Sequence, residues 1–198
     1  MTNTIFSKVP RIITTKRLCL RLPQAGDGAL LYAAMLDGYD DCVYWLNWPK
    51  TPPSIAQIEE DCKKHSVGFS ESDGLRYLIV NSTTNQIMGR IAYPPAISKW
   101  NIPTFGISYF IAKSFQGKNY ATEAAASMTK MAFEVLKARK VKITVDPDNI
   151  ASAKIPLKLG FELEARQKGE WFRVDKPLAE LHTYALFDMS LFIERVGY

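Results

Sequence analysis

The stretch SFQGKNYATEAAASM, residues 114–128, joins a polar loop directly to an alanine-rich segment. Apolar residues then recur at three- and four-residue spacing as far as Leu136, which predicts an amphipathic helix. The first N–H groups of a helix have no partner inside it and carry the positive end of the helix dipole. The loop is therefore either an ordinary connection or a cradle for an anion, in which Gly117 permits close approach of the backbone and Lys118 adds a positive charge.

The glycine spacing of this loop excludes the two best-known phosphate-binding motifs. A nucleotide P-loop needs the pattern G-x-x-x-x-G-K-[ST], and a dinucleotide fingerprint needs several spaced glycines. The loop QGKNYA, residues 116–121, has a single glycine. Taken alone, it supports the anion cradle and the ordinary turn equally.

The composition indicates an ordinary globular protein of one domain. The chain has 198 residues, of which 47 % are hydrophobic and 23 % are charged. Its net charge of +5 is too small and too dispersed to indicate a nucleic-acid partner. No signal peptide is recognisable and the apolar stretches are no longer than strands, so we expect no membrane partner.

The three cysteines, Cys19, Cys42 and Cys62, favour a reducing cytoplasm over a disulfide framework, because they are odd in number and widely spaced. Cys62 and His65 have a C-x-x-H spacing, but no second pair lies nearby and a structural zinc site needs about four ligands. We therefore expect a cytoplasmic protein without a metal.

Alternation and capping signals divide the N-terminal half into short elements. A strand is predicted over residues 17–23 and a helix over residues 27–36, whereas the aromatic, proline-broken residues 44–54 are predicted to form a loop. Ser54 and Gln57 have capping-box spacing and begin a second helix that ends near Gly68. One side of the first helix carries Ala29, Leu30, Ala33 and Ala34.

The remainder predicts a mixed α+β fold, in which an antiparallel meander is followed by a parallel crossover. The helix after residue 120 connects two predicted strands, so these two should lie parallel. Asp148 or Asn149 is expected to cap a short helix that ends at Gly160, where another strand begins. The other strands are predicted over residues 76–82, 86–93, 104–112, 140–145 and 182–190.

Residues 105–161 resemble the acetyl-CoA-binding core of the GNAT acetyltransferases. The matching features are the loop QGKNYA, the ATEA that opens the helix, the N-x-x-S of Asn149 and Ser152, and the KLGF at residues 158–161. The branch with the ribosomal-protein N-acetyltransferases (RimJ/RimL-like) is the most similar, since TTKRLCLRLPQAGDGALLYAAM and YWLNW resemble its opening strand, helix and aromatic loop. The resemblance implies a GNAT-like fold, with a mostly antiparallel twisted sheet, a splayed parallel pair of strands and flanking helices.

The resemblance covers most of the chain and implies one acetyltransferase domain over residues 1–198. Residues 1–100 would shape the acceptor side, residues 104–165 would form the acetyl-CoA-binding core, and residues 166–198 would form a C-terminal strand region.

The resemblance also implies how acetyl-CoA is held. The diphosphate would bind backbone amides at the helix start, and the pantetheine arm would lie between the splayed strands like a missing strand. Asn149 would bind a pantetheine amide, unless it serves only as a helix cap. The implied coenzyme-binding residues are Phe110, Ile111, Ala112, Gln116, Gly117, Lys118, Asn119, Tyr120, Ala121, Thr122, Asn149 and Ser152.

The implied reaction transfers an acetyl group directly from the thioester to an amine, with Ile111 and Ser152 as the expected catalytic residues. A backbone N–H near Phe110 or Ile111 would stabilise the oxyanion, and Ser152 would donate a hydrogen bond to the departing thiolate. Because an amine is mostly protonated near neutral pH, another group must accept its proton. The candidates for this base are Asp146, Glu123 and His182, each of which also has an ordinary structural role.

Three residues depart from the family pattern. Asn119 replaces the central glycine of the loop, although asparagine adopts positive φ more readily than most residues with a side chain. Gly106 stands where many relatives carry a glutamate that acts as a base, and Pro156 stands where others carry a tyrosine that acts as an acid. These departures leave a non-catalytic acyl-CoA-binding module open as an alternative.

The acceptor is expected to be a protein N-terminal amine or, alternatively, a small amine such as a drug or a polyamine. Trp45 and Trp48 are the candidate acceptor-binding residues, because aromatic faces suit ammonium groups, although they can equally pack under the loop. Segments 94–101 and 167–177, which carry Trp100 and Trp171, are further candidate acceptor loops. We expect a monomer or a homodimer.

Overall fold

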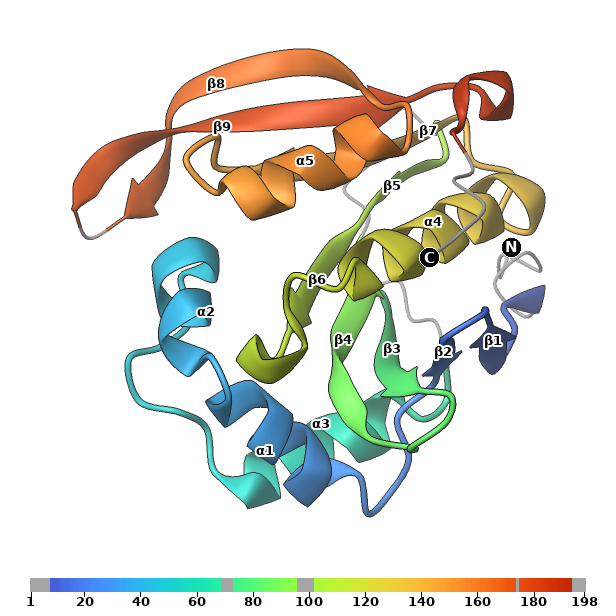
Figure 1. The fold of residues 1–198 in the computed structure, drawn as a ribbon, viewed down its shortest axis with the longest axis vertical. Coiled ribbons are helices and arrows are strands. Elements are labelled where there is room, and N and C mark those ends of the chain that lie inside the picture. Colours follow the sequence, from blue (N-terminus) through green and yellow to red (C-terminus); the bar gives the residue numbers. More distant parts are fainter. Residues whose placement is uncertain (1–7, 69–72, 96–101, 174, 194–198) are drawn as a thin grey trace.

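The computed structural model describes residues 8–68, 73–95, 102–173 and 175–193, and it has the expected mixed α+β fold (Figure 1). Within these ranges one sheet has the strand order β1–β2–β3–β4–β6 and the other has the order β5–β7–β9–β8. The strands are β1 (Ile12–Thr14), β2 (Leu18–Arg21), β3 (Leu75–Asn81), β4 (Ile87–Tyr93), β5 (Thr104–Gly106), β6 (Ser108–Ile111), β7 (Lys140–Val145), β8 (Glu162–Arg173) and β9 (Lys176–Leu186). The helices are α1 (Gly28–Leu36), α2 (Tyr39–Leu46), α3 (Ile55–His65), α4 (Tyr120–Glu134) and α5 (Ile150–Lys158), and Lys113–Phe115 form a 3-10 turn.

The sheet that contains β3 is covered on both faces, so its alternating side chains enter two different cores. Tyr77 and Ile79 belong to the core that includes the apolar side of α4. Leu78 and Val80 belong to the core on the opposite face, with Leu31 of α1 and residues of α2 and α3. In Figure 1, α4 lies between the two sheets, and α1 and α3 lie beyond β3 and β4.

The predicted strand over residues 104–112 is divided at Ile107, and this division opens the fold. Before it, β5 pairs in parallel with β7, with Phe105 opposite Val141, and the Ile107 N–H donates to Lys142 O at 2.9 Å. After it, β6 pairs with β4, and β7 has β5 and β9 as its neighbours. The predicted parallel pair of strands and its splay are therefore confirmed.

Residues 44–54 were predicted to be a loop, but their first part is the end of α2. Gly38 at φ 102° precedes this helix and Asn47 at φ 52° follows it, so residues tolerant of positive φ mark both ends. Asp40 and Asp41 in its first turn complement the helix dipole. The dense aromatic residues and following prolines concealed this short helix in the sequence.

The capping box that begins α3 was predicted correctly. The Gln57 N–H donates to Ser54 Oγ at 3.2 Å, and the Ser54 N–H donates to Gln57 Oε1 at 2.8 Å. Of the predicted side of α1 only Ala34 is buried, since Leu30 is 60 % exposed and the other packed residues are Gly28, Leu31 and Met35. The cause is tertiary, because α1 packs against both α3 and β4.

The C-terminal region is a long hairpin rather than an acceptor loop followed by a strand. Strands β8 and β9 pair from Glu162 opposite Ala185 to Arg173 opposite Lys176, so most of residues 167–177 lies in strands. The many exposed charged residues of β8 hid the length of this strand. The last strand, β9, runs from Lys176 to Leu186, whereas the sequence predicted it over residues 182–190. Trp100 lies outside the described residues.

The KLGF sequence has a structural cause at its glycine. Gly160 lies at φ +83°, and a Cβ atom there would approach Leu191 O to 2.2 Å. Only glycine fits this turn between α5 and β8 without moving the backbone. None of the described helices combines the length and the apolar character that a membrane span requires.

Candidate functional site

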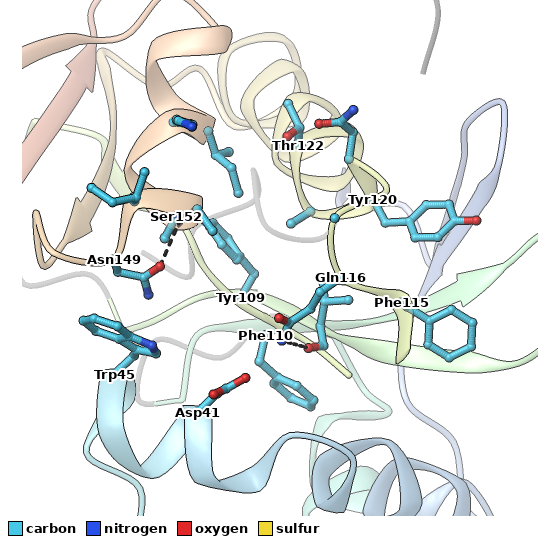
Figure 2. A pocket seen from close by; sticks show the side chains of 18 of the residues that line it. Asp41, Trp45, Tyr109, Phe110, Phe115, Gln116, Tyr120, Thr122, Asn149 and Ser152 are labelled. Atoms are coloured by element: carbon cyan, nitrogen blue, oxygen red, sulfur yellow. Dashed lines mark hydrogen bonds between the residues drawn. The ribbon is translucent and has the colours of Figure 1, made fainter. Parts of the chain in front are cut away.

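A cavity of about 740 Å³ lies between β6, the loop before α4, the first turns of α4 and α5, and α2 (Figure 2). All of the predicted coenzyme-binding residues line it except Ala112 and Lys118. The Lys118 side chain instead donates to Ser114 O at 3.1 Å, and its Nζ lies 5.6 Å from the centre of the Phe115 ring. Lys154 and Lys158 line the cavity and supply positive charge in its place.

The start of α4 presents a row of main-chain donors to this cavity. Among the described residues we find no acceptor for the backbone N–H groups of residues 117–122, and the first helical bond runs from the Glu123 N–H to Asn119 O at 3.1 Å. Gln116 holds the loop in place, since its Nε2 donates to Ile111 O at 3.0 Å. This helix start therefore has the unpaired donors and the dipole that an anion requires.

The loop conformation explains both its glycine and its asparagine. Gly117 lies at φ +75°, and a Cβ atom there would meet no atom of the described chain within 4 Å. Asn119 lies at φ 61° in the left-handed region, which glycine and asparagine adopt more readily than other residues. Its Oδ1 accepts a hydrogen bond from Lys158 Nζ at 2.7 Å, which joins the loop to α5.

The outer edge of β6 presents further main-chain groups. The Ala112 N–H donates to Met88 O at 2.8 Å, toward β4. In an antiparallel strand, the main-chain groups of alternate residues bond to the same neighbouring strand. The main-chain groups of Phe110 therefore also point toward β4, whereas those of Tyr109 and Ile111 point toward the opposite edge. Where the structure describes the chain, no acceptor contacts the N–H groups of Tyr109 and Ile111. Of the two predicted oxyanion donors, the geometry therefore favours Ile111 over Phe110.

A hydrogen-bonded pair of hydroxyl groups, Tyr109 and Ser152, lies between β6 and α5, with their oxygens 2.9 Å apart (Figure 2). The Ser152 N–H also donates to Asn149 Oδ1 at 3.1 Å, so Asn149 is the N-cap of α5. Burial raises the pKa of Tyr109 to about 12, and the bond with Ser152 opposes this only in part. The phenol is therefore a neutral donor near neutral pH. The sequence did not single out Tyr109, because it stood among the large apolar residues of its strand.

Glu123 anchors α4 rather than serving as a base. It is 4 % exposed and accepts hydrogen bonds from Thr15 Oγ1 at 2.6 Å and from Arg17 Nε at 2.7 Å. Arg17 also donates to Lys118 O at 3.0 Å. These bonds attach the connection between β1 and β2 to the loop and helix that carry the free donors.

The other two predicted bases also lie outside the lining of the cavity. Asp146 is buried and accepts from Arg173 Nη1 at 2.9 Å, and His182 lies 2.6 Å from a Glu180 carboxylate oxygen. Each of the three candidates is thus engaged by a partner and lies outside the lining of the cavity. The structure does place the Asp41 carboxylate at the cavity, with no side-chain partner in the part of the chain that is described.

Arg173, near the end of the β8–β9 hairpin, fixes the position of Trp45. Its guanidinium is 5 % exposed, lies 5.1 Å from the Tyr44 ring centre and 5.3 Å from that of Trp45, and pairs with Asp175 at 2.7 Å. Burial lowers the pKa of Arg173, but its hydrogen bonds to carboxylates outweigh this and hold the pKa above the ordinary value. The hairpin is therefore tied to α2 beside the cavity.

Trp45 and Trp48 do not form one wall. Trp45 lines the large cavity, whereas Trp48 lines a second cavity of about 260 Å³. The Trp48 ring packs edge-on against Phe110, with ring centres 5.1 Å apart, and is tilted against Tyr39 at 5.5 Å.

No cluster of three or more His, Cys, Asp or Glu side chains that could hold a metal occurs in the described part of the chain. Cys62 and His65 are both buried in the packing of α3. Burial raises the pKa of the Cys62 thiol to about 11, as expected for a core cysteine.

Comparison with known proteins agrees with this geometry. A family model described as an acetyltransferase (GNAT) domain matches residues 17–162. The sequence is 24 % identical over 152 residues to YnaD, an uncharacterised N-acetyltransferase of Bacillus subtilis, covering 77 % of this chain and 83 % of YnaD.

Solved structures of ribosomal-protein acetyltransferases share the fold. RimL, the ribosomal L7/L12 alpha-N-protein acetyltransferase, in complex with coenzyme A, has a TM-score of 0.78 at 21 % identity, covering 89 % of this chain and 97 % of RimL. The ribosomal-protein-S5-alanine acetyltransferase of Vibrio fischeri has a TM-score of 0.77 at 15 % identity, covering 91 % and 98 %. Since the family model spans most of the chain, the protein belongs to the GNAT family of acetyltransferases.

Proposed function

We propose that this acetyltransferase uses acetyl-CoA to acetylate a protein N-terminal amine. The observation that carries the proposal is the meeting, in one cavity, of two sets of N–H groups that have no acceptor among the described residues, those of residues 117–122 and those of Tyr109 and Ile111 at the outer edge of β6. The likeness to RimL and to the ribosomal-protein-S5-alanine acetyltransferase supports an N-terminal acceptor. The free thiols of Cys19, Cys42 and Cys62 support a cytoplasmic location.

The cavity has donors for each part of the coenzyme. The N–H groups of residues 117–122 would bind the diphosphate, with Lys158 close enough to the loop to add positive charge. The N–H groups of Tyr109 and Ile111 would bind carbonyl groups of the pantetheine arm as a neighbouring strand would. Asn149 uses its oxygen as the cap of α5, so its amide nitrogen is the group available to a ligand.

The side chains beside Ser152 suit transfer of the acetyl group that acetyl-CoA supplies as a thioester. The Ile111 N–H is available to stabilise a developing oxyanion. The Tyr109 and Ser152 hydroxyl pair can supply a proton or hydrogen bond to a departing thiolate, and so replaces the acid missing at Pro156. Asp41 is the carboxylate best placed to accept a proton from the acceptor amine.

Thiol release from acetyl-CoA, measured with a panel of N-terminal peptides, polyamines and amine-bearing drugs, tests the function. We expect a peptide with a free N-terminus to accelerate thiol release above hydrolysis, because the amine then reaches the carboxylate that accepts its proton. Asp41→Asn should lower kcat/KM by about a hundredfold. Asp40→Asn changes the exposed neighbour in the same turn of α2 and should leave kcat/KM unchanged.

If coenzyme binds and no acceptor accelerates thiol release, the chain is an acyl-CoA-binding module and the transferase proposal is wrong. Faster release with polyamines or drugs than with peptides would instead assign it a small-amine acceptor.

Gly117→Ala should raise the Kd for acetyl-CoA by about tenfold, because a methyl group would stand where the main-chain donors meet the diphosphate. Gly26→Ala is the matched control, since Gly26 also has positive φ (+97°) and a Cβ atom there would also meet no atom of the described chain within 4 Å, yet Gly26 does not line the cavity. Both substitutions should lower stability by about 1 kcal/mol. Calorimetric titration and thermal unfolding measure the two effects, and equal coenzyme affinity in the two variants would exclude the proposed role of Gly117.

Tyr109→Phe and Ser152→Ala should each lower kcat by about tenfold to a hundredfold, with little change in the Kd for acetyl-CoA. Since the pKa of Tyr109 is raised to about 12, the phenol keeps its proton, and loss of this proton should not reduce wild-type kcat up to about pH 10. Tyr32→Phe, on α1, is the control, because it removes a phenol hydroxyl that has no hydrogen-bond partner among the described residues and does not line the cavity. Unchanged kcat in both Tyr109→Phe and Ser152→Ala would rule out their role.

A further inference from the structure

The second cavity, of about 260 Å³, lies on the other face of β6 and is floored by residues that the strand register brings together. Ala92 lies opposite both Arg76 and Ser108, and Arg90 lies opposite Phe110. Residues directly opposite each other in an antiparallel sheet share a face. Two arginines therefore lie on one sheet face, in a cavity that Trp48 also lines.

The two guanidinium groups have donors to spare. Arg76 and Arg90 each donate through Nη1 to a different oxygen of Asp61, at 3.0 Å for Arg90. The Nε and Nη2 atoms of both arginines have no acceptor among the described residues, and none of these atoms is fully buried. These N–H groups are therefore accessible where both residues line the cavity.

The charge around the cavity is positive. Asp61 supplies one negative charge against two guanidinium groups, and the nearby Asp73 carboxylate pairs with Lys64 at 2.5 Å. His65 adds no positive charge near neutral pH, because burial and then the charge of Arg76 lower its pKa. Burial and the charge of Arg76 also lower the pKa of Arg90. An entering anion would therefore be stabilised by both arginines, and a cation would be repelled.

The second cavity adjoins the proposed reaction site. Leu46, Tyr109 and Phe110 line both cavities. Successive side chains of a strand point to opposite faces. Tyr109 therefore points toward Ser152 (Figure 2), whereas the Phe110 ring lies on the other face, with its centre 5.9 Å from Arg90 Cζ. A molecule that passes this point of β6 can place one group beside Ser152 and another beside Arg90.

We infer that the second cavity is the acceptor subsite and that it takes an acceptor carrying a carboxylate close to the amine that is acetylated. This inference rests on the proposed function. Arginine binds a planar carboxylate through two parallel N–H groups, which the free Nε and Nη2 atoms provide. The volume is below the range of about 300–1,000 Å³ that drug-sized ligands need, so it suits one acidic side chain or one free amino acid.

Paired acceptors test the inference by thiol release. Peptide amides of equal length that begin with Glu, Gln or Lys test a side-chain carboxylate as the anion. Alanine and alaninamide, compared with each other, test an α-carboxylate as the anion. We expect kcat/KM for the acidic member of at least one pair to exceed that of its neutral partner by about tenfold or more, with the Lys peptide the poorest acceptor.

Arg76→Gln and Arg90→Gln should abolish that preference by lowering kcat/KM for the acidic acceptor about tenfold to a hundredfold, while kcat/KM for the neutral acceptor stays within about threefold. Arg139→Gln removes an equal charge from an exposed position outside both cavities and should leave the preference intact. Thermal unfolding identifies any variant that fails to fold, and Arg76→Lys retains the charge without the planar pair of donors.

Equal rates for acidic and neutral acceptors, or equal losses for both in the arginine variants, would overturn the inference. If no acceptor accelerates thiol release, the proposed function fails, and calorimetry with coenzyme A present decides the inference separately. The probes are N-acetylglutamyl and N-acetylglutaminyl peptide amides, and N-acetylalanine with its amide. Tighter binding of an acidic probe, lost in Arg76→Gln, would support the anion subsite, and equal binding of each pair would exclude it.

Discussion

The N–H groups at the start of α4 are the constraint on which this structure depends, because the first N–H groups of a helix have no acceptor within it and carry the positive end of its dipole. Helix α4 begins at the cavity, and the N–H groups of its first turn have no acceptor in the described chain. The edge of β6 presents a second such set, since β7 diverges from it after Ile107. An elongated ligand with an anionic end and amide groups satisfies both sets at once, which is how fold and function are connected here.

The surrounding ion pairs hold these donors in place. Glu123 and Arg17 attach the start of α4 to the neighbouring strands, and Arg173 ties the β8–β9 hairpin to α2. Both ion pairs join residues that are far apart in the sequence, and each includes a side chain that is about 5 % exposed or less. Removing one charge of such a pair leaves the other buried without its partner, which is costly. The carboxylates of Glu123 and Asp146 are thus committed to architecture, and Asp41 is the one we assign to proton transfer.

Local signals predicted much of the fold, and tertiary contacts account for what they did not predict. The loop before α4, the capping box of α3 and the helix cap at Asn149 are encoded within a few residues, so they could be read directly. Helix α2 was missed because aromatic residues and prolines surround it. The pairing of Tyr109 with Ser152 and the meeting of Arg76 with Arg90 depend on strand register and packing across distant segments, which one sequence does not reveal.

Amide chemical shifts of the ¹⁵N-labelled protein, recorded while acetyl-CoA is added, test the central claim most directly. The account predicts that the backbone amide signals of residues 117–122 and of Ile111 shift and saturate together, because these N–H groups exchange water for the ligand. Signals from the far end of α4 should move little. Saturable binding that leaves the amides of residues 117–122 and Ile111 unshifted would contradict the account.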